Sequence, residues 1–169
     1  DYETCAMMFE ELAKVDAAYA DTFVTNFVAF RNIHLKGTPE QAQHFVDMTI
    51  DNGFAAFCLT EANAGSDVAG MKSTAVLDGD EYVLNGTKTF ITNGSIASIY
   101  VIFAKTDPEA RGHGITAFLV DRDTPGLSAG AHENKMGFRL SDTTEVIMDN
   151  VRVPKSAVIG QPGEGMSIA

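Results

Sequence analysis

The chain of 169 residues has the length of about one domain, and its 45% hydrophobic and 21% charged residues are typical of a globular protein. This composition excludes disordered, collagen-like and disulfide-scaffold chains. The formal net charge of −11 makes nucleic acid and anionic membranes poor partners, because both are themselves negatively charged.

The first third of the chain is predicted to be helical. Apolar residues recur at spacings of three and four from Cys5 to Tyr19, which places them on one helical face. A second segment, 23–33, is apolar on all sides, so we expect it to be largely buried. Residues 38–41 (Thr-Pro-Glu-Gln) form a capping box with proline at the first helical position. The helix that follows is expected to run to about Asn52 and to end at Gly53.

From residue 54 onward, short β-like runs alternate with turn residues. The runs are 54–60, 74–77, 81–84, 98–106, 115–121 and 144–153. Tight turns are predicted at 78–80 (Asp-Gly-Asp) and at 85–87 (Asn-Gly-Thr). We therefore expect the α+β class, with N-terminal α-helices followed by an antiparallel β-barrel or sandwich domain.

Cysteine and histidine usage gives little sign of redox or metal chemistry. The two cysteines, Cys5 and Cys58, are too few for a disulfide framework and indicate a reducing compartment. The apolar neighbours of Cys58 favour a place in the core over a role as nucleophile. The four histidines have no ligand-spaced partner, so we expect no metal site. Apolar runs all fall short of the roughly 20 residues that span a membrane.

Two segments carry residues suited to a cofactor. In the loop 59–67, small residues allow close approach of a ligand, and Thr60 and Ser66 supply hydroxyl groups near peptide N–H groups that can face a phosphate. In 88–93, Phe90 can lie against a planar heterocycle to which Thr92 donates a hydrogen bond. On spacing alone, the first segment is as readily an ordinary polar loop and the second a strand with alternating faces. GxGxxG and P-loop patterns are both missing, which disfavours those nucleotide sites.

Five segments in order resemble the signature motifs of one family. They are TEANAGSD at 60–67, GDEYVLNGTK at 79–88, FITN at 90–93, KMGFR at 135–139 and VRVP at 151–154, the last followed by the glycines of 160–165. The family is that of the acyl-CoA dehydrogenases, whose motifs read TEPxAGSD, GDxYxLNGxK, W/F-I-T-N, KMGxR and VRVP…GxxGxG. This chain departs at Ala62, where proline is usual, and at Phe90, where tryptophan is common. The second change keeps an aromatic ring for stacking but removes an indole N–H.

The resemblance implies a fold, a cofactor and site residues. Family members are FAD-dependent flavoproteins built from an N-terminal helical domain, a middle β-barrel-like domain and a C-terminal four-helix bundle. The residues implied to line the flavin and its phosphates are Phe57, Leu59, Thr60, Gly65 and Ser66. Ser66 is also implied to contact the acyl-CoA substrate. Phe90, Ile91 and Thr92 are implied to cover the isoalloxazine ring, with Thr92 close to its N5 atom.

The resemblance also implies a reaction and partners. The family dehydrogenates acyl-CoA thioesters between Cα and Cβ and passes the electrons to an electron-transfer flavoprotein. In most members the base is a glutamate of a C-terminal helical domain, so we expect no catalytic residue in this chain. Glu61 belongs to the binding motif and receives no base role from the resemblance. Members commonly form homotetramers, in the bacterial cytoplasm or the mitochondrial matrix.

We therefore expect a fragment of a longer enzyme that is inactive alone. Residues 1–53 are assigned to a partial N-terminal helical domain, 54–160 to the middle β domain and 161–169 to the start of a truncated C-terminal helical domain. One alternative is an acyl-CoA oxidase or flavin monooxygenase of the same superfamily. The other is a non-catalytic β domain that binds a protein partner.

Overall fold

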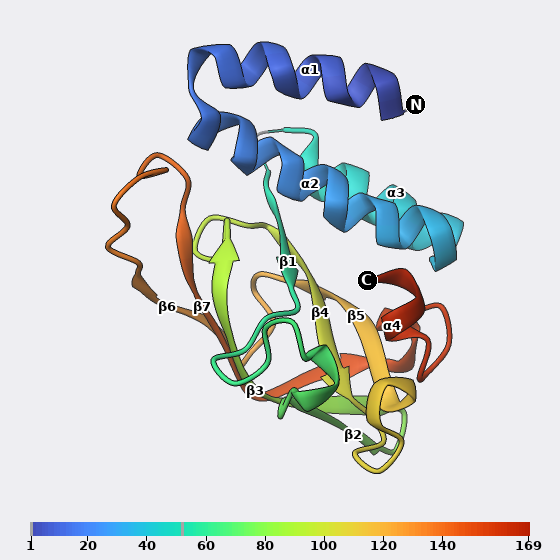
Figure 1. Cartoon of the computed structure of the whole chain (residues 1–169). Helices are drawn as coiled ribbons and strands as arrows, with labels where there is room; N and C mark the ends of the chain where they lie inside the picture. Colours follow the sequence, from blue (N-terminus) through green and yellow to red (C-terminus); the bar gives the residue numbers. More distant parts are fainter. Residues whose placement is uncertain (1, 52) are drawn as a thin grey trace.

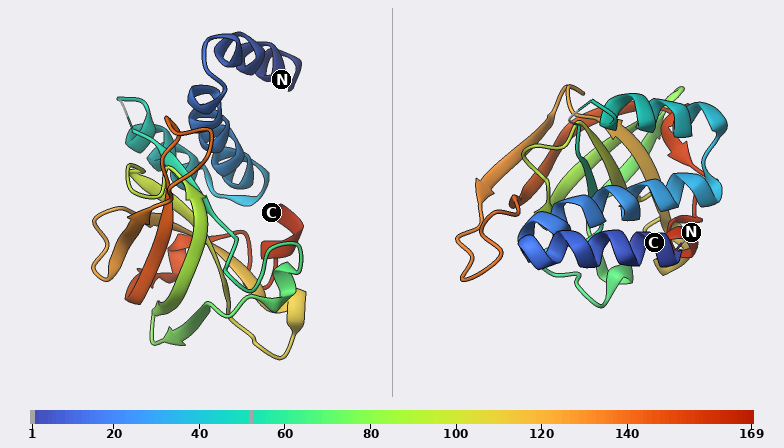
Figure 2. Two further views of the ribbon diagram at one scale, coloured as in Figure 1. Left: turned by 60° about the vertical axis from the view of Figure 1, so that its left-hand side comes forward. Right: turned by 90° about the horizontal axis from the view of Figure 1, so that it is seen from above.

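The computed structural model describes residues 2–51 and 53–169. Three helices come first, α1 (Tyr2–Val15), α2 (Ala17–Lys36) and α3 (Pro39–Thr49). The strands are β1 (Ala55–Cys58), β2 (Thr74–Asp78), β3 (Glu81–Thr92), β4 (Ile99–Lys105), β5 (Ile115–Asp121), β6 (Leu127–His132), β7 (Thr143–Pro154) and β8 (Val158–Ile159). Short 3₁₀ turns are η1 (Val68–Gly70), η2 (Arg111–Gly114) and η3 (Lys155–Ala157). The last described element is the short helix α4 (Gly165–Ile168). The helices stack over one end of the sheet, with α1 outermost (Figures 1 and 2).

The helical segment confirms the predicted capping box and corrects two expectations. The Thr38 hydroxyl accepts from the backbone N–H of Gln41, and the Gln41 side-chain oxygen accepts from the backbone N–H of Thr38. The expected continuous apolar face is interrupted at Asp16, which caps a new helix by accepting from the N–H groups of Ala18 and Tyr19. The helix α3 ends at Thr49, earlier than expected, and Asn52 lies outside the described residues.

Burial of α2 is less complete than its composition predicts. Within 23–33, Ala29, Asn32 and Ile33 are buried, whereas the phenylalanines are half-buried. Phe27 meets Phe9 of α1 edge-on, with ring centroids 6.1 Å apart. The apolar residues on all sides of this helix thus face the sheet, α1 and α3, where Phe30 contacts Phe45. None of the helices in the described part of the chain is long and apolar enough to cross a bilayer.

The described strands form one open, mostly antiparallel sheet in the order β6-β7-β3-β2-β4-β5-β8, with β1 paired to β4. The pairing of β1 with β4 is parallel, and so is the single β2–β4 pair. The α+β class is confirmed, while the sheet stays open and fits a barrel or sandwich only loosely. The run 115–121 matches β5 at both ends.

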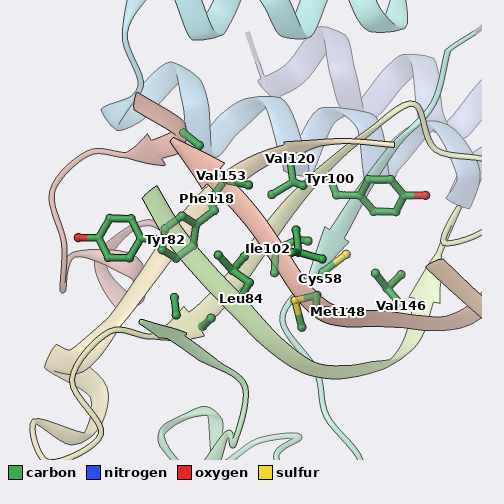
Figure 3. Packing of buried hydrophobic residues seen from close by; sticks show 14 of the residues in the cluster. Cys58, Tyr82, Leu84, Tyr100, Ile102, Phe118, Val120, Val146, Met148 and Val153 are labelled. Atoms are coloured by element: carbon green, nitrogen blue, oxygen red, sulfur yellow. The ribbon is translucent and has the colours of Figure 1, made fainter. Parts of the chain in front are cut away.

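Two buried clusters lie on opposite faces of β4. Tyr100 and Ile102 point into a cluster between β4–β5 and β3–β7, which also holds Tyr82 and Phe118 (Figure 3). The alternate residues of β4 face α2, α3 and α4 in the second cluster, with Phe103 fully buried there. A strand covered on both faces is a continuous apolar run, as 99–104 is.

Two β features differ from the sequence prediction. The Asn85-Gly86 pair lies inside β3 and not in a turn, at a register shift between Leu84 and Gly86. Gly86 has φ +142°, and a Cβ there would collide with Ser73, so the glycine serves a bulge. The strand β6 lies outside the predicted runs, because its Leu-Ser-Ala-Gly-Ala-His sequence consists mostly of small residues and has no β-branched side chain and no phenylalanine, tyrosine or tryptophan, and it joins the sheet as an edge.

Candidate cofactor-binding site

The two segments predicted to serve a cofactor lie side by side. After β1, a tight turn forms with reciprocal backbone bonds between Glu61 and Ala64, of 3.1 and 3.0 Å. The carbonyl oxygen of Thr60 accepts from the N–H of Thr89 at 2.9 Å. This bond joins the loop 59–67 to the end of β3, so the TEANAGSD and FITN motifs share one region of the surface.

A buried ion pair fixes this arrangement from below. The ammonium group of Lys88 lies 2.8 Å from Oε1 of Glu61 and 3.2 Å from the carbonyl oxygen of Leu59. Glu61 also accepts from the backbone N–H groups of Lys72 at 2.6 Å and Ser73 at 3.0 Å. The side chains of Lys88 and Glu61 are 0% and 4% exposed. One carboxylate therefore ties both ends of the loop 61–72 to β3.

The electrostatics of the pair favour a charged carboxylate. Burial alone raises the pKa of Glu61, but hydrogen bonds from the backbone of Lys72, from Lys88 and from Ser73, together with the charge of Lys88, bring it below its usual value. Burial lowers the pKa of Lys88, and the hydrogen bond and charge of Glu61 oppose that effect. A carboxylate held by three donors is a poor proton acceptor, so this geometry does not favour Glu61 as a base.

Lys88 is not among the site residues predicted from sequence. The alternation of side chains along β3 could have indicated it. Tyr82 and Leu84 point inward, and Lys88 lies an even number of residues further on, at another inward position. A lysine at an inward position requires an acidic partner, and Glu61 stands in the neighbouring motif. The partner's identity follows from the tertiary fold and not from the spacing.

Phe90 is the exposed aromatic residue of the site. It occupies a register shift between Lys88 and Ile91, with φ 57°, and its side chain is 65% exposed. Positive φ at a phenylalanine is uncommon and strained, and such strain is concentrated at ligand sites. Ile91 is 2% exposed and packs into the first core cluster, so its side chain is turned away from the surface that Phe90 occupies.

Of the remaining predicted residues, two are half-buried at the end of β1 and two are exposed in the loop 59–67. Phe57 and Leu59 are half-buried against the second core cluster, Phe57 with its ring 5.1 Å from that of Phe103. Gly65 and Ser66 are exposed in the loop. A Cβ on Gly65 would meet nothing within 4 Å, and its φ is not positive, so the fold itself does not require glycine there. A bare backbone in open space fits the close approach of a phosphate.

Cys58 lies between Phe57 and Leu59 in the chain, and its predicted core position is confirmed. It is 0% exposed, and burial raises the pKa of its thiol to about 12, an effect that the charge of Lys88 opposes. Within the described residues, no group of three or more His, Cys, Asp or Glu side chains is placed to hold a metal ion.

We expect a thiol reagent to modify one cysteine of the native protein quickly. Cys5 is partly exposed on α1, whereas Cys58 becomes accessible only when the protein unfolds. Cys58 should therefore react at least roughly a thousandfold more slowly than Cys5. Ellman's reagent with and without urea measures both rates, and Cys5→Ser removes the fast phase. A fast phase that persists in Cys5→Ser would contradict the buried position.

Comparison with known proteins places these motifs in a family. A family model described as the acyl-CoA dehydrogenase middle domain matches residues 56–151. Over 164 residues the chain is 42% identical to the mitochondrial short/branched chain specific acyl-CoA dehydrogenase of Rattus norvegicus, covering 96% of this chain and 38% of that protein.

Solved structures agree in fold. Butyryl-CoA dehydrogenase from Megasphaera elsdenii superposes with a TM-score of 0.91 at 41% identity, covering 95% of this chain and 43% of that one. A prolyl acyl carrier protein oxidase superposes with a TM-score of 0.80 at 33% identity, covering 90% of this chain and 44% of that one. The chain thus spans well under half the length of these relatives.

Proposed function

The chain belongs to the acyl-CoA dehydrogenase family, and from this premise we propose that it forms the flavin side of an enzyme that oxidises acyl-CoA thioesters between Cα and Cβ. FAD is the cofactor. When bound, FAD supplies the hydride acceptor, while residues of this chain bind and orient it.

The proposal assigns the flavin and its phosphates to Phe57, Leu59, Thr60, Gly65 and Ser66, with Ser66 also contacting acyl-CoA, and the ring face to Phe90, Ile91 and Thr92. The observation that carries it is the strained, exposed Phe90 beside the loop 59–67. An exposed aromatic ring next to a small-residue loop suits a planar ring with a phosphate tail. Because the Ile91 side chain is in the core, its contribution to that face is through the main chain.

The base that removes the α-proton is proposed to lie outside these 169 residues. Glu61, the buried acidic residue of the binding motif, is already held by three donors. The chain alone should therefore bind the cofactor and substrate in part but not turn over. We further propose a homotetramer as the complete enzyme, with an electron-transfer flavoprotein as electron acceptor, in the bacterial cytoplasm or the mitochondrial matrix.

The test compares the 169-residue chain with a longer gene product that contains it. FAD binding is followed by flavin fluorescence, and turnover of butyryl-CoA and longer acyl-CoA thioesters is followed with an artificial electron acceptor. We expect enoyl-CoA from the longer protein and none from the chain alone. Turnover by the 169 residues would refute the external base. Failure of the longer protein to bind saturating FAD would instead favour a protein-binding β domain.

A second candidate is an acyl oxidase of the same superfamily. Similarity to the prolyl acyl carrier protein oxidase favours it, because that enzyme shares the fold over 90% of this chain. The two candidates differ in the electron acceptor, since an oxidase reduces O₂ to hydrogen peroxide. Oxygen consumption with stoichiometric peroxide would support the oxidase, and turnover that requires an added acceptor would support the dehydrogenase.

A further inference from the structure

Thr92 is linked to a carboxylate of the helical segment. Its hydroxyl lies 3.5 Å from Oδ2 of Asp21 on α2. The same oxygen accepts from the hydroxyl of Ser141 at 2.9 Å, and Ser141 is 2% exposed. Asp21 therefore joins three segments that are remote in sequence, namely α2, the end of β3 and the loop before β7.

The position of this carboxylate is well determined. Lys135 donates to the carbonyl oxygen of Ser141 and to the hydroxyl of Thr143, both at 2.7 Å, which fixes the loop that carries Ser141. Thr143 is the strand partner of Thr92, so the same lysine also ties that loop to the end of β3. The Asp21–Thr92 contact is long, but hydrogen bonds at ligand sites are often long in ligand-free structures and shorten on binding.

The partner determines the direction of the bond. A carboxylate only accepts, and a threonine hydroxyl carries a single hydrogen, so Thr92 donates that hydrogen to Asp21. What Thr92 can offer to a bound ligand is then a lone pair and not a hydrogen. This reverses the expectation from sequence, in which Thr92 donates to the heterocycle.

We propose that Asp21 is a positioning residue that keeps Thr92 a hydrogen-bond acceptor and thereby favours reduced over oxidised FAD. The inference rests on the proposed function, in which Thr92 belongs to the flavin ring face, and on the family resemblance, which implies that Thr92 lies near N5. That atom carries a hydrogen in the reduced ring and a lone pair in the oxidised ring. An acceptor at Thr92 therefore complements the reduced ring and faces the lone pair of the oxidised one.

Asp21 also carries charge, and a negative charge acts on the flavin whatever Thr92 does. The two effects separate in a double-mutant cycle of Asp21→Asn and Thr92→Val in the FAD-loaded protein. The two-electron midpoint potential reports the ratio of affinities for reduced and oxidised FAD, and a tenfold change in this ratio is about 30 mV. A denaturation curve of each variant verifies that it is folded.

We expect Thr92→Val to lower the preference for reduced FAD by roughly three- to tenfold, the effect of one hydrogen bond. Asp21→Asn should shift the midpoint potential by different amounts in the parent and in the Thr92→Val variant. The part of the shift that is present only with Thr92 should correspond to a weaker preference for reduced FAD. Thr92→Ser, which keeps the hydroxyl, should stay close to the parent. Ser141→Ala, which loosens Asp21 but keeps its charge, should give a smaller shift that also disappears with Thr92→Val.

Equal shifts for Asp21→Asn in both backgrounds would overturn the inference, because charge alone would explain them. Should Asp21→Asn fail to fold, the Ser141→Ala pair decides in the same way. Absence of FAD binding by the parent protein would be a different result. It would reject the proposed function itself, and the inference with it.

Discussion

Replacing Lys88 by methionine is expected to lower the free energy of unfolding by about 3–5 kcal/mol, the usual effect of removing one partner of a buried ion pair. The substitution leaves the carboxylate of Glu61 buried at 4% exposure without its cation. It also deprives the carbonyl oxygen of Leu59 of a donor. Urea denaturation of the parent and of Lys88→Met measures the change.

The role of the pair is tested by a cycle with Glu61→Gln. Glutamine removes the charge and keeps a single amide oxygen, so it can accept from only one of the backbone N–H groups of Lys72 and Ser73, which bind different carboxylate oxygens of Glu61. The double variant should therefore be more stable than the sum of the single effects predicts, by roughly 1–3 kcal/mol. Simple additivity would mean that the two charges do not stabilise each other.

An exposed pair provides the matched control. Lys155 lies 3.0 Å from Asp80, a distance similar to that in the buried pair, but these side chains are 51% and 100% exposed. We expect Lys155→Met to leave the urea midpoint unchanged, since solvent screens exposed pairs. A similar loss at both lysines would show that burial is not the cause.

Acid titration examines the same pair from the other partner. The pKa of Glu61 is lowered in the folded protein, so its contribution is fully present above the ordinary value of 4.5 and is lost as the pH falls through the folded pKa. The parent should lose stability below about pH 4.5 in part through this group. Glu61→Gln should lack that part of the loss. An unchanged acid limb in Glu61→Gln would contradict the lowered pKa.

Predictions that depend on residues close together in the sequence agree best with the structure. The capping box at 38–41 and the strand 115–121 depend on residues within a few positions of each other, and both are present as predicted. Where a local signal had two solutions, the fold decided between them. Asn85-Gly86 suits a turn as well as a bulge, and the close approach of Ser73 to Gly86 makes it a bulge.

The site was predictable as a set of segments but not as a geometry. The motifs mark 60–67 and 88–93, and the structure places them side by side. The orientation of each side chain depends on contacts between distant elements. Ile91 turns into the core, Phe90 turns out, and Thr92 points at a helix 71 positions earlier. Residue spacing contains no information on such contacts, because they arise only when the sheet and the helices pack.

Replacing Asn93 by alanine is the second change expected to be strongly destabilising, by about 3 kcal/mol. Asn93 follows Thr92 directly and is 0% exposed. Its amide nitrogen donates to the carbonyl oxygens of Thr22 on α2 and Ala55 on β1, each at 3.0 Å. One side chain thus holds the helices, β1 and the end of β3 together, next to the proposed flavin site.

Two causes contribute to that loss, and two further variants separate them. Asn93 has φ 63°, a conformation that asparagine and glycine tolerate better than alanine. Asn93→Gly loses the same hydrogen bonds without the backbone strain, so it should be more stable than Asn93→Ala by about 1 kcal/mol. Asn93→Asp keeps the shape but places acceptors against two carbonyl oxygens, and it should be the least stable of the three.

The control for Asn93 is the exposed Asn63, whose amide nitrogen donates to the carbonyl oxygen of Gly70 at 3.2 Å. The loss in Asn63→Ala should stay within about 0.5 kcal/mol, since water replaces the lost partner at the surface. Because Asn93 anchors the strand end that carries Phe90 and Thr92, its alanine variant should also bind FAD more weakly than the parent when it is folded. If the Asn93 variants unfold at the same urea concentration as the parent, the link between the helices and the sheet does not depend on this side chain.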